Sequence, residues 1–340
     1  MISTKIRLLP ALAAFTAAGL VLTACGGNSQ TGETSTSPAA DASSTAASSA
    51  GTITIQDNRG EVTVPSPPKS VIVTDNRLFE PLYNWGVKLA AAPVDLMAED
   101  AGYKKDSSIV DLGNHREPNL EAAVTVNPDL VINGQRFANQ YDALKALLPN
   151  AAFVDLDVRD DQPFDKELIR QVTVAGEIFG KQDEAAKLVS DFEAAIARVK
   201  AAYKPEAKVM GIITSGGKIN YAAPTTGRTL GPVYDILGLT PALGTEGSTD
   251  HQGDEISVEA IAQANPDWIL VMDRDAAIGS EDGAVVPAEQ MLKESAALQN
   301  VTAVQKNQVV IMPPDTYLNE GIQTYTEYFN SLADAMEAAA

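Results

Sequence analysis

Two arginines at matched positions are the first residues whose type and spacing point to chemistry. Arg136 and Arg274 each stand nine positions after the asparagine of an Asn-Pro-Asp triplet, at 127–129 and 265–267, with a short apolar run between. A guanidinium stays charged at physiological pH and donates forked hydrogen bonds, which suit anions. The spacing therefore predicts two fixed cations that face one anionic ligand.

The segments around these arginines predict how they are positioned. Proline disfavours helix at the residue before it, so each triplet is typical of a turn, and each apolar run is typical of a buried parallel strand. A glutamate, Glu121 or Glu259, precedes each asparagine by six positions. An arginine just past the carboxyl end of such a strand lies where open α/β sheets bind ligands. We predict two related lobes that share a cleft; a chance likeness between two βα units is the alternative.

Composition limits the class of partner. The chain has 340 residues, which gives room for two domains, and its formal net charge is -20. That acidity argues against nucleic acid as a partner but still allows an anionic small ligand in a cleft lined by a few arginines. A single cysteine, Cys25, gives no intrachain disulfide, and two histidines are too few for a multi-histidine zinc site.

The beginning of the chain is typical of export. Residues 1–24 carry Lys5 and Arg7, then an apolar run and small residues, as a secretory signal peptide does. The run ends in Leu-Thr-Ala-Cys at 22–25, which resembles the bacterial lipobox, where the cysteine receives diacylglycerol and becomes the mature N-terminus. An uncleaved transmembrane helix is the alternative. The Ser, Thr, Ala and Gly of residues 25–50 predict a flexible tether spanning roughly 25–30 Å.

The rest of the chain predicts an α/β fold: two Rossmann-like lobes with mostly parallel sheets, joined by one long rigid helix, with the ligand cleft between them. We place the first lobe at 51–165, a helical connection that includes the long helix at 166–204, and the second lobe at 205–340. The segment 78–86 is echoed by 230–238, and an arginine precedes each, Arg77 and Arg228.

Together these features resemble the class III substrate-binding lipoproteins of ABC importers, and within them the ferric-catecholate siderophore binders. The resemblance rests on the lipobox, the two lobes with a rigid helical connection, and the two Asn-Pro-Asp strands, and it covers about residues 50–338. It implies a lipid-anchored extracytoplasmic protein, a monomer without catalytic activity or intrinsic cofactor. Such a protein captures an Fe(III)–siderophore and delivers it to the permease.

The resemblance also implies three arginines around the ligand. Arg228 matches one in Thr-Gly-Arg at 226–228, and Arg274 matches another. Arg136 matches the third, although one extra residue at 133–136 separates it from the family's Ser-Gly-Arg context. A ferric tris-catecholate is about triply negative, and guanidinium planes hydrogen-bond its oxygens and stack on its rings.

Two further residues resemble iron ligands that some members supply when the siderophore gives only four oxygens. His251 lies in a loop at 248–253, and Tyr317 follows the last strand at 313–318. Phenolate and imidazole both suit iron. The alternatives are a loop histidine and a core tyrosine. His115 receives no ligand role, although Arg116 beside it could reach the cleft rim.

Glu121 and Glu259 match the acidic residues with which this class engages arginines of the permease. Stabilisation of a helix N-terminus, after Asn119 or Ser257 as N-cap, is an alternative that can hold at the same time.

Two other readings stay open. A haem or cobalamin-type ligand would fit the same fold, with His251 and Tyr317 as axial ligands of haem. A secreted serine hydrolase could use Ser215, His251 and Asp250, but the chain lacks a G-x-S-x-G elbow around Ser215, and adjacent Asp250 and His251 are poorly placed for a triad.

Overall fold

The computed structural model describes residues 51–279 and 285–340, which belong to one compact unit, Ser49–Ala340. The predicted signal peptide, the tether and the lipidation site Cys25 lie outside the described residues. Within the described part of the chain, no helix combines the length and apolar character needed to cross a membrane.

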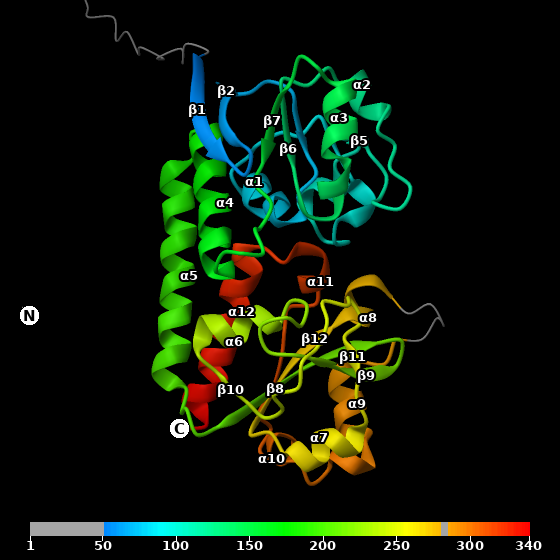
Figure 1. The fold of residues 1–340 in the computed structure, drawn as a ribbon, viewed down its shortest axis with the longest axis vertical. Coiled ribbons are helices and arrows are strands. Elements are labelled where there is room, and N and C mark those ends of the chain that lie inside the picture. Colours follow the sequence, from blue (N-terminus) through cyan, green and yellow to red (C-terminus); the bar gives the residue numbers. More distant parts are fainter. Residues whose placement is uncertain (1–50, 280–284) are drawn as a thin grey trace, which may run out of the picture. The chain divides into compact units, whose positions relative to one another are not determined.

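A parallel five-stranded sheet forms the first lobe (Figure 1). Its strands, in spatial order, are β5 (Val110–Asp111), β4 (Ala91–Ala92), β3 (Val71–Val73), β6 (Leu130–Asn133) and β7 (Ala152–Asp155). The hairpin predicted from alternating residues is present as antiparallel β1 (Gly51–Asp57) and β2 (Gly60–Ser66). The central strands β3 and β6 are fully buried, as expected for a parallel sheet with both faces covered.

Short helices fill the connections of this lobe. They are η1 (Asn76–Leu78), α1 (Phe79–Asn84), η2 (Val94–Leu96), η3 (Gly102–Lys105), α2 (Ala122–Thr125), η4 (Gln135–Gln140) and α3 (Tyr141–Leu147). Two apolar clusters pack around the sheet, one of them reaching the hairpin and the following long helix.

The helical connection between the lobes consists of two helices, α4 (Phe164–Phe179) and α5 (Gln182–Ala202), which lie side by side (Figure 1). Gly180 ends α4 in the left-handed region with φ 65°, a conformation that costs glycine little. α5 also packs along α12 (Ile322–Ala338), where Phe192 and Phe329 stack with ring centroids 5.8 Å apart. This packing along its length stiffens the connection.

The second lobe has a mixed, mostly parallel sheet in the order β11-β9-β8-β12-β13, with β10 parallel to β8. The strands are β8 (Lys208–Ser215), β9 (Lys218–Ala222), β10 (Thr240–Pro241), β11 (Asp254–Glu255), β12 (Trp268–Asp273) and β13 (Val309–Ile311). Its other helices are α6 (Gly231–Leu237), α7 (Val258–Ala264), α8 (Arg274–Ile278), α9 (Ala288–Glu294), η5 (Ala296–Leu298), α10 (Thr302–Gln305) and α11 (Thr316–Asn319).

The two Asn-Pro-Asp triplets have the same local geometry. Asn127 and Asn265 both adopt left-handed backbone, with φ 42° and 43°. The strands that follow, β6 and β12, pair in parallel with the earliest strand of the main sheet in their lobe, β3 and β8. At the other end of these pairs, the Thr74 hydroxyl donates to Asn133 Oδ1 at 3.0 Å, as the Thr214 hydroxyl does to Asp273 Oδ1 at 3.1 Å. The repeat in the sequence is thus a repeat in structure.

The aspartates of the triplets tie each pair of strands together. The Asp129 carboxylate accepts hydrogen bonds from the backbone N–H of Lys69 and Ser70, at 2.8 and 3.0 Å. Asp267 Oδ2 accepts from the N–H of Lys208 at 2.8 Å. The aspartate of each triplet therefore fixes where the neighbouring strand, β3 or β8, begins. This sets the register of the strand pair and with it the position at which the arginine-bearing segment leaves β6 or β12.

Candidate functional site: arginines around Tyr317

Three guanidiniums surround one tyrosine ring at the junction of the lobes. The Cζ atoms of Arg136, Arg228 and Arg274 lie 4.8, 5.2 and 5.1 Å from the centroid of the Tyr317 ring. Arg136 is in η4 after β6, Arg228 in the turn before α6, and Arg274 opens α8 after β12; Tyr317 is on α11. Each distance is within the reach of a cation–π contact.

Polar contacts hold each guanidinium in place. Arg136 Nη2 donates to the backbone carbonyl of Tyr317 at 2.8 Å, which links the first lobe to the second. Arg274 Nη1 donates to the Ser215 hydroxyl at 3.0 Å. Arg228 Nε and Nη2 donate to the two carboxylate oxygens of Glu320 at 3.1 and 3.0 Å. The arginines are therefore pre-arranged, which reduces the entropy lost when a ligand binds.

The arginines change the acidity of the phenol. Burial of Tyr317 opposes ionisation, but the nearby guanidiniums of Arg274 and Arg136 outweigh it and lower the pKa of the hydroxyl. A phenol with a lowered pKa gives up its proton more readily to a metal, because phenolate is a hard, anionic oxygen ligand of Fe(III). Tyr317 can thus serve both as a ring for stacking and as an oxygen donor.

Both histidines lie close enough to this cluster to sense its charge. Burial and the charge of Arg274 lower the pKa of His251, and Arg228 and Arg136 add to the effect. Burial and the charge of Arg136 lower the pKa of His115, with further contributions from Arg228 and His251. The two imidazoles are therefore biased toward the neutral form, the form that can donate a lone pair to a metal.

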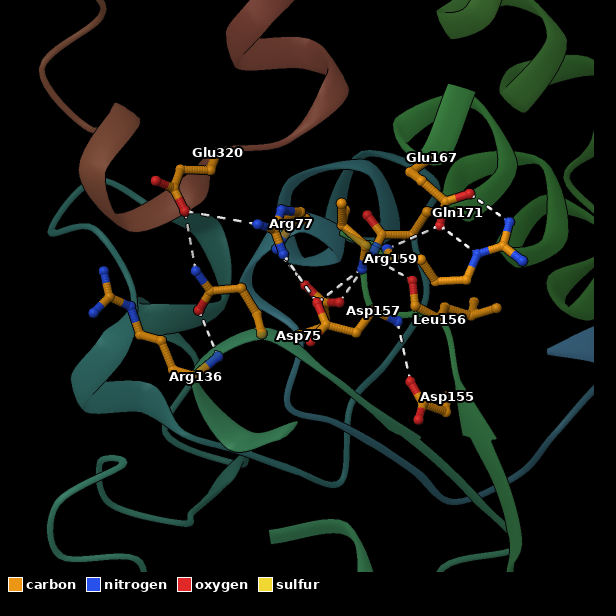
Figure 2. A network of polar contacts seen from close by, with 12 residues as sticks. Asp75, Arg77, Arg136, Asp155, Leu156, Asp157, Arg159, Glu167, Gln171 and Glu320 are labelled. Atoms are coloured by element: carbon orange, nitrogen blue, oxygen red, sulfur yellow. Dashed lines mark hydrogen bonds and ion pairs between the residues drawn. The ribbon is translucent and has the colours of Figure 1, made fainter. Parts of the chain in front are cut away.

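Glu320 is the buried counter-charge of the site. Burial alone would raise its pKa, but the arginines Arg228 and Arg77 outweigh burial and lower it to about 2. The Thr229 hydroxyl donates to Oε1 at 2.6 Å. Gln135 Nε2 donates to Oε2 at 3.1 Å, and Arg77 Nη2 lies 3.9 Å from the same oxygen. One carboxylate thus joins side chains of both lobes; Figure 2 shows its contact with Arg77 of the first lobe.

The network continues behind Arg77 into the first lobe (Figure 2). Arg77 Nη1 pairs with Asp157 at 3.2 Å. Gln171 Nε2, from α4, donates to Asp75 at 2.7 Å. Burial raises the pKa of Asp75 to about 7, against the opposing charge of Arg77. The loop after β3, the loop after β7 and α4 are therefore connected through side chains to the arginines around Tyr317.

The structure brings together four of the five ligand residues expected from the sequence, Arg136, Arg228, Arg274 and Tyr317. The fifth, His251, is linked to them by the effect of their charge on its pKa. Their role as ligand contacts remains a prediction.

The extra residue before Arg136 is Gln135, and its side chain makes hydrogen bonds in the site. Gln135 adopts left-handed backbone with φ 51° and accepts from the Arg136 N–H through its side-chain oxygen. It therefore bridges to Glu320 while Arg136 still reaches Tyr317. Sequence reasoning gave no site role to Gln135 or Glu320, and none to His115. Arg77 was visible only as the counterpart of Arg228 in the repeated segments.

Glu121 and Glu259 lie at the beginnings of α2 and α7, and both are exposed. Ser257 is the N-cap of α7, as expected, and its hydroxyl oxygen accepts from the Ala260 N–H at 3.2 Å. The N-cap of α2 is Glu121 and not Asn119, although the Asn119 side chain accepts from the Ala122 N–H at 3.3 Å. In Figure 1, α2 and α7 lie at the outer ends of the two lobes, away from the junction.

Comparison with known proteins gives the family. The model of the periplasmic binding protein family matches residues 71–316. The chain belongs to this family. It is 30% identical over 269 residues to the ferric-anguibactin-binding protein FatB of Vibrio anguillarum, covering 78% of this chain and 81% of FatB. It is 26% identical over 291 residues to the petrobactin-binding protein YclQ of Bacillus subtilis, covering 84% and 88%.

The fold agrees with solved structures of the family. The crystal structure of YclQ superposes with a TM-score of 0.72 at 24% identity and covers 84% of this chain and 99% of YclQ. The siderophore-binding protein BauB, solved with acinetobactin and ferric iron, gives a TM-score of 0.71 at 23% identity and covers 84% and 99%. Both confirm the two-lobed α/β fold predicted from the sequence. The named relatives are binding proteins.

The contacts of Ser215 bear on the hydrolase alternative. The Ser215 hydroxyl accepts a hydrogen bond from Arg274, a cation that cannot act as a general base. The site thus assigns Ser215 to holding an arginine.

Proposed function

We propose that this protein binds a ferric siderophore at the Arg136–Arg228–Arg274 cluster and hands it to an ABC importer for iron uptake. The observation that carries the proposal is the convergence of three guanidiniums from both lobes on the Tyr317 ring. The names of FatB and YclQ, which bind ferric-anguibactin and petrobactin, support it. The protein performs no chemistry on its cargo and has no cofactor of its own.

The chemistry of the site fits such a cargo. Siderophore oxygens around Fe(III) are anionic acceptors, and forked guanidiniums bind them with charge-assisted hydrogen bonds. Catechol rings add a flat surface on which a guanidinium stacks. Where a siderophore occupies only four of six positions on the iron, the Tyr317 phenolate and the His251 imidazole would supply the other two.

A titration by fluorescence tests this function. The mature chain without lipid, which contains Trp85 and Trp268, is titrated with ferric catecholates, a ferric hydroxamate and haem. We expect saturable quenching by ferric catecholates and weaker binding after Arg136→Ala. Arg198→Ala is the matched control, because Arg198 lies on α5 and pairs with Asp334 and Glu337. A Soret shift with haem, together with no response to any ferric siderophore, would make haem the ligand.

We also propose that the protein is held at the outer face of the cell membrane by lipid on Cys25. The support is the lipobox at 22–25 and the polar residues behind it. Cys25→Ser should release the protein from the membrane fraction with unchanged ligand affinity, because a diacylglycerol supplies the apolar area that anchors it. Fractionation and immunoblotting measure this, and retention of the variant in membranes would assign anchoring to the apolar segment itself.

A further inference from the structure

Glu320 contacts both lobes and one ligand arginine through a single buried carboxylate. Its residue is 4% exposed and its backbone is left-handed, with φ 50°, a conformation that non-glycine residues seldom adopt. The carboxylate accepts from Arg228 and Thr229 of the second lobe and from Gln135 of the first. A strained backbone held by this many partners indicates that the position of the carboxylate matters to the site.

The carboxylate changes how much positive charge the site offers a ligand. Arg228 is bound to Glu320 at both oxygens, in the bidentate geometry that neutralises a guanidinium most completely. Arg77, the other cation near Glu320, is paired with Asp157. Arg274 Nη1 lies 4.0 Å from Asp275. Among the described residues, no carboxylate forms an ion pair with Arg136. Of the three arginines around Tyr317, Arg228 is therefore neutralised and Arg274 is partly screened, so the site offers a ligand less than three positive charges.

The balance of charge decides which cargo fits. A triply negative complex brought to this junction would meet one unpaired and one partly screened guanidinium, and part of its charge would be desolvated without compensation, which is costly. A complex with one or two negative charges would be matched. The Arg228 plane is meanwhile held over the Tyr317 ring, where it can stack and hydrogen-bond without supplying net charge.

We propose that Glu320 is a specificity-determining residue of the ligand site. It positions Arg228 over Tyr317 and cancels its charge, so that the protein favours ferric complexes of one or two negative charges over triply negative ones. This inference rests on the proposed function, since it names the class of ferric siderophore that the same site takes. Anionic complexes of mixed donors, such as catecholate with hydroxamate, belong to the favoured class.

The test uses hexadentate ferric complexes that differ only in charge. Each catecholate exchanged for a hydroxamate makes the complex one charge less negative and leaves the iron saturated, so coordination by Tyr317 does not enter. We expect the wild-type protein to bind the singly and doubly negative complexes more tightly than the triply negative one. Glu320→Gln keeps the size of the side chain and removes its charge. Each negative charge on the ligand then gains attraction. The Kd of the triply negative complex divided by the Kd of the singly negative complex should therefore fall by about tenfold.

A second variant separates charge from position. Thr229→Val removes one hydrogen bond to Glu320 and leaves its charge. It should weaken all complexes by the same factor and leave the ratio unchanged, while Glu320→Gln also steepens the dependence of Kd on salt for the triply negative complex. Thermal melts show that each variant is folded.

Three outcomes decide the matter. A wild-type preference for the triply negative complex overturns the inference even if no variant folds. An unchanged ratio in folded Glu320→Gln overturns it as well and leaves Glu320 as a structural residue, with the proposed function intact. If the wild-type protein binds no ferric complex of any charge, the proposed function fails, and the inference fails with it.

Discussion

At the scale of single residues, Tyr317 is the position whose chemistry depends most on its surroundings. Its type and place after the last strand are readable in the sequence, and so are the arginines nine residues after each Asn-Pro-Asp. The lowered pKa of its hydroxyl is not readable, because it arises from Arg274 and Arg136, which come from different lobes. The sequence thus indicated residues that meet at Tyr317 but not their effect on one another.

Tyr317→Phe tests whether this phenol binds iron. The substitution removes the oxygen and keeps the ring that the guanidiniums face. We expect a large loss of affinity for tetradentate ferric siderophores, which leave iron positions open, and little loss for hexadentate ones. A phenolate-to-iron charge-transfer band, recorded by absorption with the tetradentate complex, should vanish in the variant.

Arg274→Ala provides the contrast. It removes a charge-assisted contact worth about 1.5–3 kcal/mol for ligands of both kinds. Equal losses of affinity for tetradentate and hexadentate siderophores in Tyr317→Phe would show that Tyr317 lines the site but does not coordinate iron.

At the scale of elements, local sequence signals predicted the turns and strands, whereas contacts between distant segments could not be predicted. The turn, strand and arginine order of each repeat follows from proline, apolar runs and spacing, and all of it is present. The function of the aspartates was not predicted, because Asp129 acts on Lys69 and Ser70, about 60 residues earlier in the chain. A single sequence does not show which backbone N–H groups a turn residue will meet.

Asp267→Ala should lower stability and leave ligand binding unchanged. It removes the acceptor of the Lys208 N–H at the start of β8, an exposed hydrogen bond whose loss costs about 0.5–1.5 kcal/mol because water replaces the acceptor. Chemical denaturation measures the loss, and titration of the folded variant with the ferric ligand supplies the control. A change in affinity without a change in stability would show that Asp267 acts on ligand binding and not on the stability of the fold.

An acidic cavity of about 500 Å³ between α1, η3 and the beginnings of α11 and α12 makes stability depend on pH. Burial raises the pKa of Glu80 to about 7, and the charges of Asp315, Glu327 and Asp100 add to the shift. Lys105 also lines the cavity. Because the folded-state pKa lies above that of the unfolded chain, the folded state holds this proton more tightly. Its stabilising effect is complete below about pH 4.5 and is lost as pH rises through about 7.

Glu80→Gln should therefore stabilise the protein at pH 8 and have little effect at pH 4.5. We expect a gain of about 1–2 kcal/mol at pH 8, reduced from the full shift because part of the side chain meets solvent. Thermal melts across this range measure it. Glu193→Gln, at an exposed position of α5, is the control. The same gain at both pH values would point to packing instead of charge.

At the scale of the whole molecule, the lobes are joined twice. A helical connection with one long helix was expected at 166–204, and the structure has two helices there, α4 and the longer α5. The second joint was not predictable, because it consists of single hydrogen bonds between segments far apart in the chain. Asn76 Nδ2 donates to the Leu318 carbonyl across 242 residues, and Arg136 donates to the Tyr317 carbonyl across 181. The short helix α11 therefore carries both Tyr317 and the carbonyls that contact the first lobe.

The outer ends of the lobes lead to the last prediction. Glu121 and Glu259 occupy equivalent places in the repeat, on helices at opposite ends of the described unit, and both are exposed (Figure 1). We expect each carboxylate to engage one arginine of a permease, and because the two contacts reinforce each other, removing both should abolish uptake. Glu121→Ala with Glu259→Ala should stop cellular uptake of the ferric ligand and leave its affinity for the purified protein unchanged.

The control replaces two other exposed glutamates, Glu193 and Glu206, by alanine, which changes the net charge equally. Uptake of radioactive iron, measured beside fluorescence titration, separates transport from binding. Normal uptake by the Glu121 and Glu259 variant would show that the two residues act only as charges that favour helix N-termini, where Asn119 and Ser257 also accept hydrogen bonds from backbone N–H groups. Loss of uptake in both variants would instead indicate a general effect of surface charge, since only the first pair is placed by the repeat.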